Sequence, residues 1–244
     1  MIDEHYQNSR LAALYDLDSG WSQDREFYFR LAGDMPMEIL DLGCGTGLLC
    51  DAYASKGHKV TGVDPADAML AVARDKPHGK SIKWIQATAQ DYHESDKSFD
   101  LIIMTGHAFQ TLLTRKDMID CFATMRQHLK RGGKVVFESR NPQIDWATSW
   151  DYEMELATGS GPVKESRKLI DFHSGVMTFD LIYGFKDRES LASKSTLRFF
   201  TQAEIEAGLR TCGLRVESLL GDWRGDEFRP DSSEEMIFIV RQAV

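Results

Sequence analysis

The stretch EILDLGCGTGLLC, residues 38–50, decides the fold. Its first five residues, 38–42, predict a short buried strand, and the residues from Leu48 onward predict a helix. The turn between them, residues 43–47, contains three glycines and has almost no side-chain bulk. Glycine permits backbone angles that a Cβ would forbid, so a ligand can approach the main chain beside the helix N-terminus. Strand, glycine turn and helix form the first half of a nucleotide-binding βαβ unit.

The glycine spacing and two acids indicate which ligand the turn can take. A dinucleotide fingerprint is G-x-G-x-x-G, whereas this turn has G-x-G-x-G and follows Asp41. A carboxylate repels a pyrophosphate, but in a shielded pocket it attracts an ammonium or a sulfonium. No Gly-Lys-Ser/Thr follows, so the turn is not a P-loop. The next strand, VTGVD, ends in Asp64, 23 residues after Asp41, where an acid can hold ribose hydroxyls.

The motifs DLGCGTG and GVDPADAML together resemble those of the class I S-adenosylmethionine (SAM) dependent methyltransferases. The resemblance implies SAM as cofactor and S-adenosylhomocysteine as product. It places Asp41 and the glycine turn at the methionine part, Asp64 at the ribose and Met69 at adenine. A structural βαβ turn with an acid nearby, or an NAD site, is the alternative interpretation. The predicted cofactor-binding residues are Tyr15, Asp41, Leu42, Gly43, Cys44, Gly45, Gly47, Asp64, Pro65, Met69, Thr88, Ala89, Gln90, Thr105, Gly106 and Gln110.

One loop departs from the family pattern. In many relatives the loop after the third strand contains Gly-Asp-Ala, and its Asp binds the adenine amino group. Here Ala87, Thr88 and Ala89 occupy these places, so the acidic contact is absent from this position. Thr88 can still form a hydrogen bond, and Ala89 can use its backbone.

Composition bounds the classes of protein that fit. The chain has 244 residues, of which 42% are hydrophobic and 27% charged, as in one large domain or one domain with an insertion. The net charge of −9 and the absence of a long Lys/Arg run favour a small substrate over nucleic acid. No apolar run is long enough to span a bilayer, and the start MIDEHYQNSR has no signal-peptide pattern. The four cysteines lack CxxC spacing, so we expect reduced thiols in a cytoplasmic protein and no metal site.

The order of predicted elements gives an α/β fold: a Rossmann-like, seven-stranded, mostly parallel sheet flanked by helices. Residues 34–150 and 201–244 form this SAM-binding core. Residues 151–200 predict short strands joined by Gly, Ser and Asp turns, and hence a small inserted antiparallel sheet. The small-molecule branch of the resembled family, such as the sugar N-methyltransferases, has such an insert over the substrate side. The insert can instead be an interface of a homodimer.

Residues 1–33 predict helices that precede the sheet, the first of them around residues 11–15. In the resembled family, N-terminal helices fold over the cofactor as a lid. Tyr6, Tyr15 and Trp21 are the candidates to close the site. Aromatic packing of a terminal helix onto the core is an equal alternative for each of them.

The loop at residues 105–110 follows an apolar central strand at its carboxyl end, where ligands bind in open α/β sheets. His107 is the titratable group there with an ordinary pKa near neutrality. It is a candidate general base and substrate contact, although it can equally orient the cofactor or cap the next helix. Gln110 is either a cofactor contact or a helix-packing residue.

A fifth strand is expected over residues 134–139, after a helix that Gly132 and Gly133 end. The segment that follows its carboxyl end contains aromatic, basic and amide side chains. These side chains can line a substrate pocket, or the segment can be a loop anchored by buried tryptophans. The predicted substrate residues are His107, Arg140, Asn141 and Trp146.

The predicted activity is methyl transfer from SAM to a nitrogen, oxygen or carboxylate nucleophile on a small molecule. Methyl transfer to RNA or protein is one alternative, and no Asn/Asp-Pro-Pro-Tyr/Phe motif for a flipped base follows Met104. A protein that binds SAM without catalysis is another. An NAD-dependent enzyme is disfavoured by the glycine spacing and by Asp41.

Overall fold

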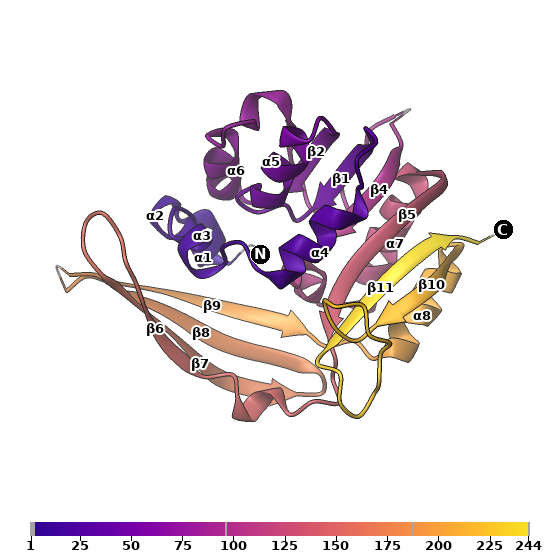
Figure 1. Cartoon of the computed structure of the whole chain (residues 1–244). Helices are drawn as coiled ribbons and strands as arrows, with labels where there is room; N and C mark the ends of the chain where they lie inside the picture. The colour runs from indigo at the N-terminus through magenta and orange to yellow at the C-terminus, as the bar shows by residue number, and fades with distance from the viewer. Residues whose placement is uncertain (1–2, 96, 187, 244) are drawn as a thin grey trace.

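The computed structural model of the chain describes residues 3–95, 97–186 and 188–243 (Figure 1). Residues 1, 2, 96, 187 and 244, which fall in the predicted N-terminal, core and inserted segments, lie outside this description. The strands are β1 (Glu38–Leu42), β2 (Lys59–Asp64), β3 (Lys83–Gln86), β4 (Phe99–Met104), β5 (Leu129–Arg140), β6 (Tyr152–Leu156), β7 (Val163–His173), β8 (Val176–Gly184), β9 (Ser190–Arg198), β10 (Leu214–Leu220) and β11 (Glu235–Gln242). The α-helices are α1 (Glu4–Gln7), α2 (Ser9–Ala12), α3 (Tyr15–Asp18), α4 (Gln23–Leu31), α5 (Leu48–Ser55), α6 (Asp67–Arg74), α7 (Arg115–His128) and α8 (Gln202–Thr211), and the 3₁₀ turns are η1 (Gly79–Ser81), η2 (Ala108–Thr111) and η3 (Trp146–Thr148).

The strands form two sheets. The seven-stranded sheet has the order β10-β11-β5-β4-β1-β2-β3, and its pairs are parallel except for the two that β11 makes. The four-stranded sheet has the order β6-β7-β8-β9 and is antiparallel throughout. Both sheets confirm the fold predicted from the sequence. The chain order reverses between β1 and β4, which is the switch point where open α/β sheets bind ligands.

The central strands are covered on both faces, which explains their almost continuously apolar sequences. On β1, Leu40 and Leu42 enter one core cluster and Ile39 enters another, because successive side chains of a strand point to opposite faces. Helices α7 and α8 pack on the first cluster, and α4 and α5 pack on the second. The strand ends are therefore where a ligand can reach the main chain of the sheet.

One predicted boundary is wrong. Helix α7 ends at His128 and β5 begins at Leu129, so Gly132 and Gly133 lie inside the strand instead of ending the helix. Leu129 pairs with Phe99 of β4, and the register shifts after that pair. Pairing with a neighbouring strand therefore overrides the local glycine signal, as β-structure depends strongly on context.

The N-terminal segment bridges the two sheets. The helix predicted around residues 11–15 is interrupted, because α2 ends at Ala12 and α3 begins at Tyr15. Helix α1 lies between α6 of the core and β9 of the four-stranded sheet (Figure 1). The backbone N–H of His5 donates to Ser193 Oγ at 3.0 Å, and the His5 Nδ1 lies 2.9 Å from the same oxygen. This contact attaches α1 to β9.

Two glycines with positive φ provide a matched test of the packing around the glycine turn. A Cβ on Gly47, at φ +71°, would lie 2.5 Å from the Trp84 ring and 2.9 Å from the Ala73 Cβ, whereas a Cβ on Gly57, at φ +85°, would meet nothing within 4 Å. We expect Gly57→Ala to lower the free energy of unfolding by about 1–2 kcal/mol through backbone strain. Gly47→Ala adds overpacking of about 1–3 kcal/mol. Urea unfolding of both variants measures the difference, and equal losses would contradict the packing.

Candidate active site

The glycine turn after β1 uses its backbone donors inside the protein. The N–H groups of Gly43 and Cys44 both donate to the Val63 carbonyl, at 2.7 and 3.0 Å. The N–H of Gly45 donates to a carboxylate at the end of β2 at 2.9 Å, and that of Gly47 donates to the Cys44 carbonyl at 2.9 Å. A pyrophosphate needs such donors to be available. The turn therefore suits a ligand that approaches the main chain without an anionic bridge.

Asp41 is a buried carboxylate with one oxygen to spare. It is 1% exposed, and its Oδ2 accepts a hydrogen bond from the Cys50 thiol at 3.3 Å. Its Oδ1 is buried and accepts no hydrogen bond from the described residues. Burial raises the pKa of Asp41 to about 7. A buried carboxylate oxygen without a donor fits the ammonium of a methionine group, which would supply both a charge and hydrogen bonds.

Asp64 joins the two loops that surround the predicted ribose. Its Oδ2 accepts the Gly45 N–H at 2.9 Å and its Oδ1 accepts the Ala66 N–H at 2.8 Å. Burial raises the pKa of this carboxyl, and the two backbone hydrogen bonds oppose that shift. Each carboxylate oxygen has two acceptor positions, so two ribose hydroxyls can still donate to Asp64.

The predicted lid residues Tyr6 and Tyr15 pack with Ala66 and Met69. The Tyr15 hydroxyl lies 3.9 Å from where a Cβ on Gly106 would stand, so Tyr15 faces the loop after β4. Burial raises the pKa of both tyrosines. These contacts place the two rings between the loops after β2 and β4.

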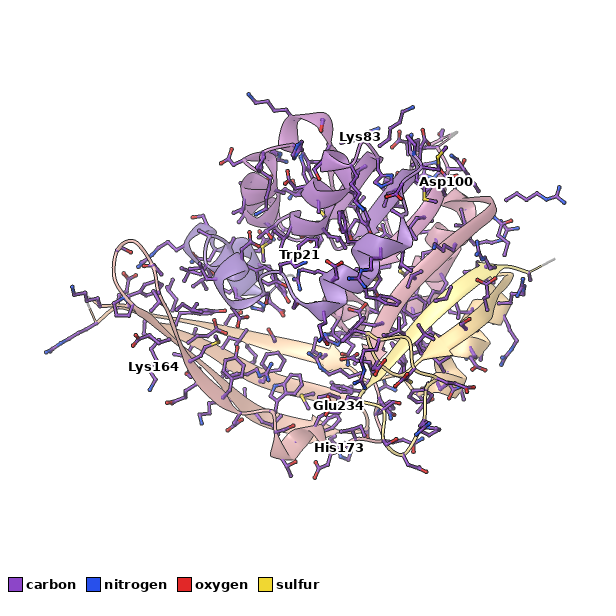
Figure 2. The ribbon with its side chains drawn as sticks, in the orientation of Figure 1. Trp21, Lys83, Asp100, Lys164, His173 and Glu234 are labelled. Carbon is purple, nitrogen blue, oxygen red and sulfur yellow. The ribbon has the colours of Figure 1, made fainter. Side chains whose placement is uncertain are left out.

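Trp21 does not share this position. Its side chain is 46% exposed and lies edge-on to Phe29 of α4, with the ring centroids 5.6 Å apart (Figure 2). The contact with Phe29 agrees with the alternative of aromatic packing, and closure of the site by Trp21 stays a prediction. Asp16 of α3, which sequence reasoning missed, holds this segment in place by accepting hydrogen bonds from Thr46 and Lys76.

The loop residues predicted to frame adenine follow β3, and several of their polar groups form hydrogen bonds within the protein. The Thr88 hydroxyl donates to Asp91 Oδ2 at 2.7 Å, and the Gln90 carbonyl accepts from Thr124 at 3.2 Å. Ala89 is buried in the core, so its backbone is the part that can face a ligand. The same holds for Leu42, which is fully buried. Two further predicted cofactor residues, Pro65 and Thr105, lie in the loops after β2 and β4. The Pro65 carbonyl accepts a hydrogen bond from Gln86, and the Thr105 carbonyl accepts one from the Ala108 N–H.

His107 lies at the end of the site where the methyl group is expected. It adopts φ +59°, a left-handed conformation that is uncommon outside glycine, and its N–H donates to Glu138 Oε1 at 2.7 Å. Its Nε2 lies 2.9 and 3.0 Å from the two carboxylate oxygens of Glu235. Glu138 is buried and also accepts a hydrogen bond from the Tyr28 hydroxyl. With Nε2–H directed at a carboxylate, Nδ1 of a neutral imidazole keeps its lone pair for another proton.

Sequence reasoning missed Glu138, Glu235 and Tyr28. An acid inside the otherwise apolar run VVFES was the available signal for Glu138. No local pattern points to Glu235, which is 128 residues from His107 in the chain. The missed residues are the ones that fix the conformation and orientation of His107.

Gln110 has the packing role that was one of its two predicted roles. It is fully buried, its Oε1 accepts from Arg140 Nη1 at 2.9 Å, and its Nε2 donates to the Arg198 carbonyl at 3.5 Å. It therefore joins the loop after β4 to β5 and to β9.

Asn141 is not placed to bind a substrate. It is 1% exposed, and its Nδ2 donates to the carbonyls of Pro230 and Ser233 at 2.7 and 2.8 Å. Its own carbonyl accepts from Trp146 Nε1 at 2.8 Å. The substrate prediction for Asn141 is therefore wrong, because its side chain anchors the loop before β11. Trp146 stays half-buried beside Arg140, whose guanidinium carbon lies 5.6 Å from its ring centroid.

The comparison with known proteins agrees with this geometry. A family model described as a methyltransferase domain matches residues 39–133, from β1 into β5. The putative methyltransferase YqeM of Bacillus subtilis (strain 168) is 25% identical over 210 residues, covering 84% of this chain and 83% of the relative. Residues 39–133 are therefore a methyltransferase domain, and the SAM-dependent methyltransferases are the family that this chain resembles.

Solved structures show the same fold as this methyltransferase. The CcbJ methyltransferase from Streptomyces caelestis matches with a TM-score of 0.81 and 19% identity over 98% of both chains. SAM-bound CalS10, an amino pentose methyltransferase from Micromonospora echinaspora, matches with a TM-score of 0.72 and 22% identity over 95% of both chains. Both matches extend over the four-stranded sheet as well as the core. Within the described part of the methyltransferase, no helix is long and apolar enough to cross a membrane.

The raised pKa of Asp41 predicts a pH-dependent stability without cofactor. Burial raises the pKa of Asp41 in the folded state from 3.8 to about 7. Below about pH 4 the carboxyl is protonated in both states and does not lower the free energy of unfolding, whereas above about pH 7 the full penalty for burying its charge applies. Between pH 4 and pH 8 we expect the wild type to lose about 2–4 kcal/mol of unfolding free energy relative to Asp41→Asn. Urea unfolding at both pH values tests this, with Asp67→Asn at an exposed site as control. A difference that does not change with pH would contradict it.

Asp64 provides a prediction on cofactor affinity. Hydrogen bonds to a charged group contribute roughly 1.5–3 kcal/mol, so Asp64→Ala should weaken SAM binding at least about tenfold. Asp67→Ala, three residues away on the surface, should bind like the wild type. Calorimetric titration with SAM measures both affinities. Equal affinity in Asp64→Ala would show that this carboxylate does not hold the ribose.

Proposed function

We propose that this enzyme transfers the methyl group of SAM to a nitrogen, oxygen or carboxylate nucleophile on a small molecule. The observation that carries the proposal is the His107–Glu235 pair, which stands beside the loop that Tyr15 covers. A carboxylate-bound imidazole is a group suited to taking a proton from an acceptor. Its position at the carboxyl end of β4 is next to the proposed cofactor site.

SAM supplies a methyl group that its sulfonium already activates, so the protein mainly has to bind and orient the reactants. Asp41 would hold the ammonium of the methionine part, and Asp64 would hold the ribose hydroxyls. His107 would take the proton that an amine or hydroxyl loses, while Glu235 keeps its ring in one orientation and stabilises the imidazolium. Positioning of this kind can supply roughly 7–11 kcal/mol of the barrier reduction.

A small acceptor is supported by the cover over the site. The N-terminal helices α1–α3 and the four-stranded sheet lie on the side of the core where the strands end (Figure 1). A polymer would need this cover to move away, whereas a small molecule can be enclosed by it. CalS10, which shares the fold, is named for an amino pentose acceptor, so amines form the first acceptor class to screen.

Two measurements test the proposal. Calorimetry with SAM, S-adenosylhomocysteine and NAD should give binding for the first two ligands and none for NAD. Incubation of the enzyme with methyl-labelled SAM and a cell extract should then place the label in the small-molecule fraction. Label in RNA or protein would favour the polymer alternatives, and tight SAM binding without any transfer would favour a sensor.

His107→Gly separates the chemical role of this residue from its structural one. Glycine tolerates φ +59° better than histidine does, so the loop should keep its conformation and SAM affinity should be unchanged. We expect kcat to fall roughly 100-fold, which is the low end for loss of a general base, and to be partly restored by free imidazole. Glu235→Gln should lower kcat about tenfold.

The matched control is His173→Gln, at the exposed end of β7 (Figure 2). It should leave kcat unchanged. A His107→Gly enzyme with wild-type kcat would remove the base role, even if methyl transfer to a small molecule is observed.

A further inference from the structure

Two arginines from different sheets share one tryptophan. Arg140 is the last residue of β5. Arg167 lies on the face of β7 that packs on the hydrophobic cluster of the four-stranded sheet. Their guanidinium carbons lie 5.2 and 4.2 Å from the ring centroid of Trp150, and that of Arg167 also lies 4.4 Å from the Tyr152 ring. The rings hold both cations in place.

Within the described part of the chain, neither cation forms a salt bridge. No carboxylate oxygen of the described residues lies within 4.0 Å of the guanidinium nitrogens of Arg140 or Arg167. Among the described residues, the hydrogen bonds of these side chains go to neutral oxygens: Arg140 donates to Gln110 Oε1 at 2.9 Å, and Arg167 donates to the Trp150 carbonyl at 2.8 Å. Burial lowers the pKa of both groups, which shows that both cations are partly removed from water. Such charges usually have a counter-ion.

The acids nearest to the two arginines are already engaged elsewhere. Near Arg140, both oxygens of Glu235 are on His107, and Glu138 accepts from Tyr28 and from the His107 N–H. Near Arg167, Glu165 is buried and accepts a hydrogen bond from the Tyr152 hydroxyl, and Asp18 accepts one from Ser19. Asp151 accepts hydrogen bonds from Lys168 and from the Leu169 N–H. The protein itself therefore leaves guanidinium donors for another molecule.

Trp150 adds a third donor. Its ring is 2% exposed, and its Nε1–H is buried without an acceptor among the described residues. Buried polar groups are rarely left unpaired, and an unpaired group at a site often marks a missing ligand. Two guanidinium groups without a carboxylate at salt-bridge distance and an indole N–H without an acceptor among the described residues, within one cluster, have the chemistry of an anion site.

The cluster lies beside the proposed reaction centre. Arg140 and His107 are linked through the end of the core sheet, because Gln110 bonds to Arg140 and lies three residues after His107. Trp150 follows β5 at its carboxyl end, where the acceptor is proposed to bind. An anionic group held here would thus belong to the molecule whose nucleophile faces His107.

We propose that Arg140, Arg167 and Trp150 form an anion site, and that the methyl acceptor is a small molecule with a phosphate or carboxylate group apart from its nucleophile. The choice of acceptor rests on the proposed function, whereas the anion site itself does not. The cluster determines which acceptor is bound, and it takes no part in the transfer step.

The site can be tested without knowing the acceptor. Enzyme loaded with S-adenosylhomocysteine is titrated with inorganic pyrophosphate and, separately, with malonate at constant ionic strength, and Trp fluorescence is recorded. We expect saturable binding of at least one probe. Tighter binding of pyrophosphate would indicate that the site recognises a phosphate, and tighter binding of malonate would indicate that it recognises a carboxylate. Arg167→Gln should weaken binding at least about tenfold, as expected for loss of charge-assisted hydrogen bonds. Arg167→Lys should be intermediate, because it keeps the charge and loses the planar donors.

Lys164→Gln is the matched control. It removes one positive charge from the same strand, but Lys164 is exposed and points away from the core (Figure 2). It should bind the probe like the wild type, and all variants should bind S-adenosylhomocysteine equally if they are folded. Absence of saturable binding for both probes, or equal binding by Arg167→Gln and the wild type, would overturn the anion site.

A second measurement separates this inference from the proposed function. Methyl transfer is compared for matched pairs of amines, each with and without a phosphate or carboxylate group. The anionic acceptor is supported if the wild type prefers the amines that have a phosphate or carboxylate group. Arg167→Gln should lose this preference because its KM for these amines rises while kcat stays similar. Transfer without preference would overturn the anionic acceptor and leave the methyl transfer intact. Transfer to RNA or protein alone would overturn the proposed function, while the probe titration still decides the anion site.

Discussion

The site depends on one buried carboxylate, that of Glu138. It accepts from Tyr28 of α4 and from the backbone N–H of His107, so it joins a helix on one face of the sheet to the loop after β4. Burial raises the pKa of Glu138, and the hydrogen bonds from the His107 N–H and the Tyr28 hydroxyl oppose that shift. Losing either donor would remove a hydrogen bond from a buried carboxylate, which costs roughly 1.5–3 kcal/mol. The left-handed conformation of His107 is maintained by this same constraint.

Around this constraint, the protein keeps several polar groups unsatisfied. The Oδ1 of Asp41 and the Nε1 of Trp150 are both buried without a hydrogen-bond partner in the described ranges of the chain. Each such group costs about 1–3 kcal/mol in the absence of a ligand. A site that is complementary to charged ligands is therefore less stable when empty than an apolar site of the same shape, and ligand binding restores the difference. The same polar groups that would bind the ligands therefore lower the stability of the empty protein.

The sequence predicts the core well because its signals are local. The strand, glycine turn and helix of residues 38–50 specify their own geometry, and an acid at the end of the second strand needs only its spacing. The contacts that complete the site are not local: Glu235 reaches His107 from the last strand, and no periodicity encodes that approach. Asn141 was misjudged because its position after a strand suggested the ligand side, whereas its amide bonds to a loop about 90 residues later.

The position of α1 has a consequence for the kinetics of the enzyme. Helix α1 rests on α6, which borders the proposed cofactor, and on β9, which belongs to the sheet over the proposed acceptor. A cofactor that enters or leaves beneath α1 must detach His5 from Ser193, and this same step uncovers the acceptor side. Exchange of the two proposed ligands would then be coupled through one short segment.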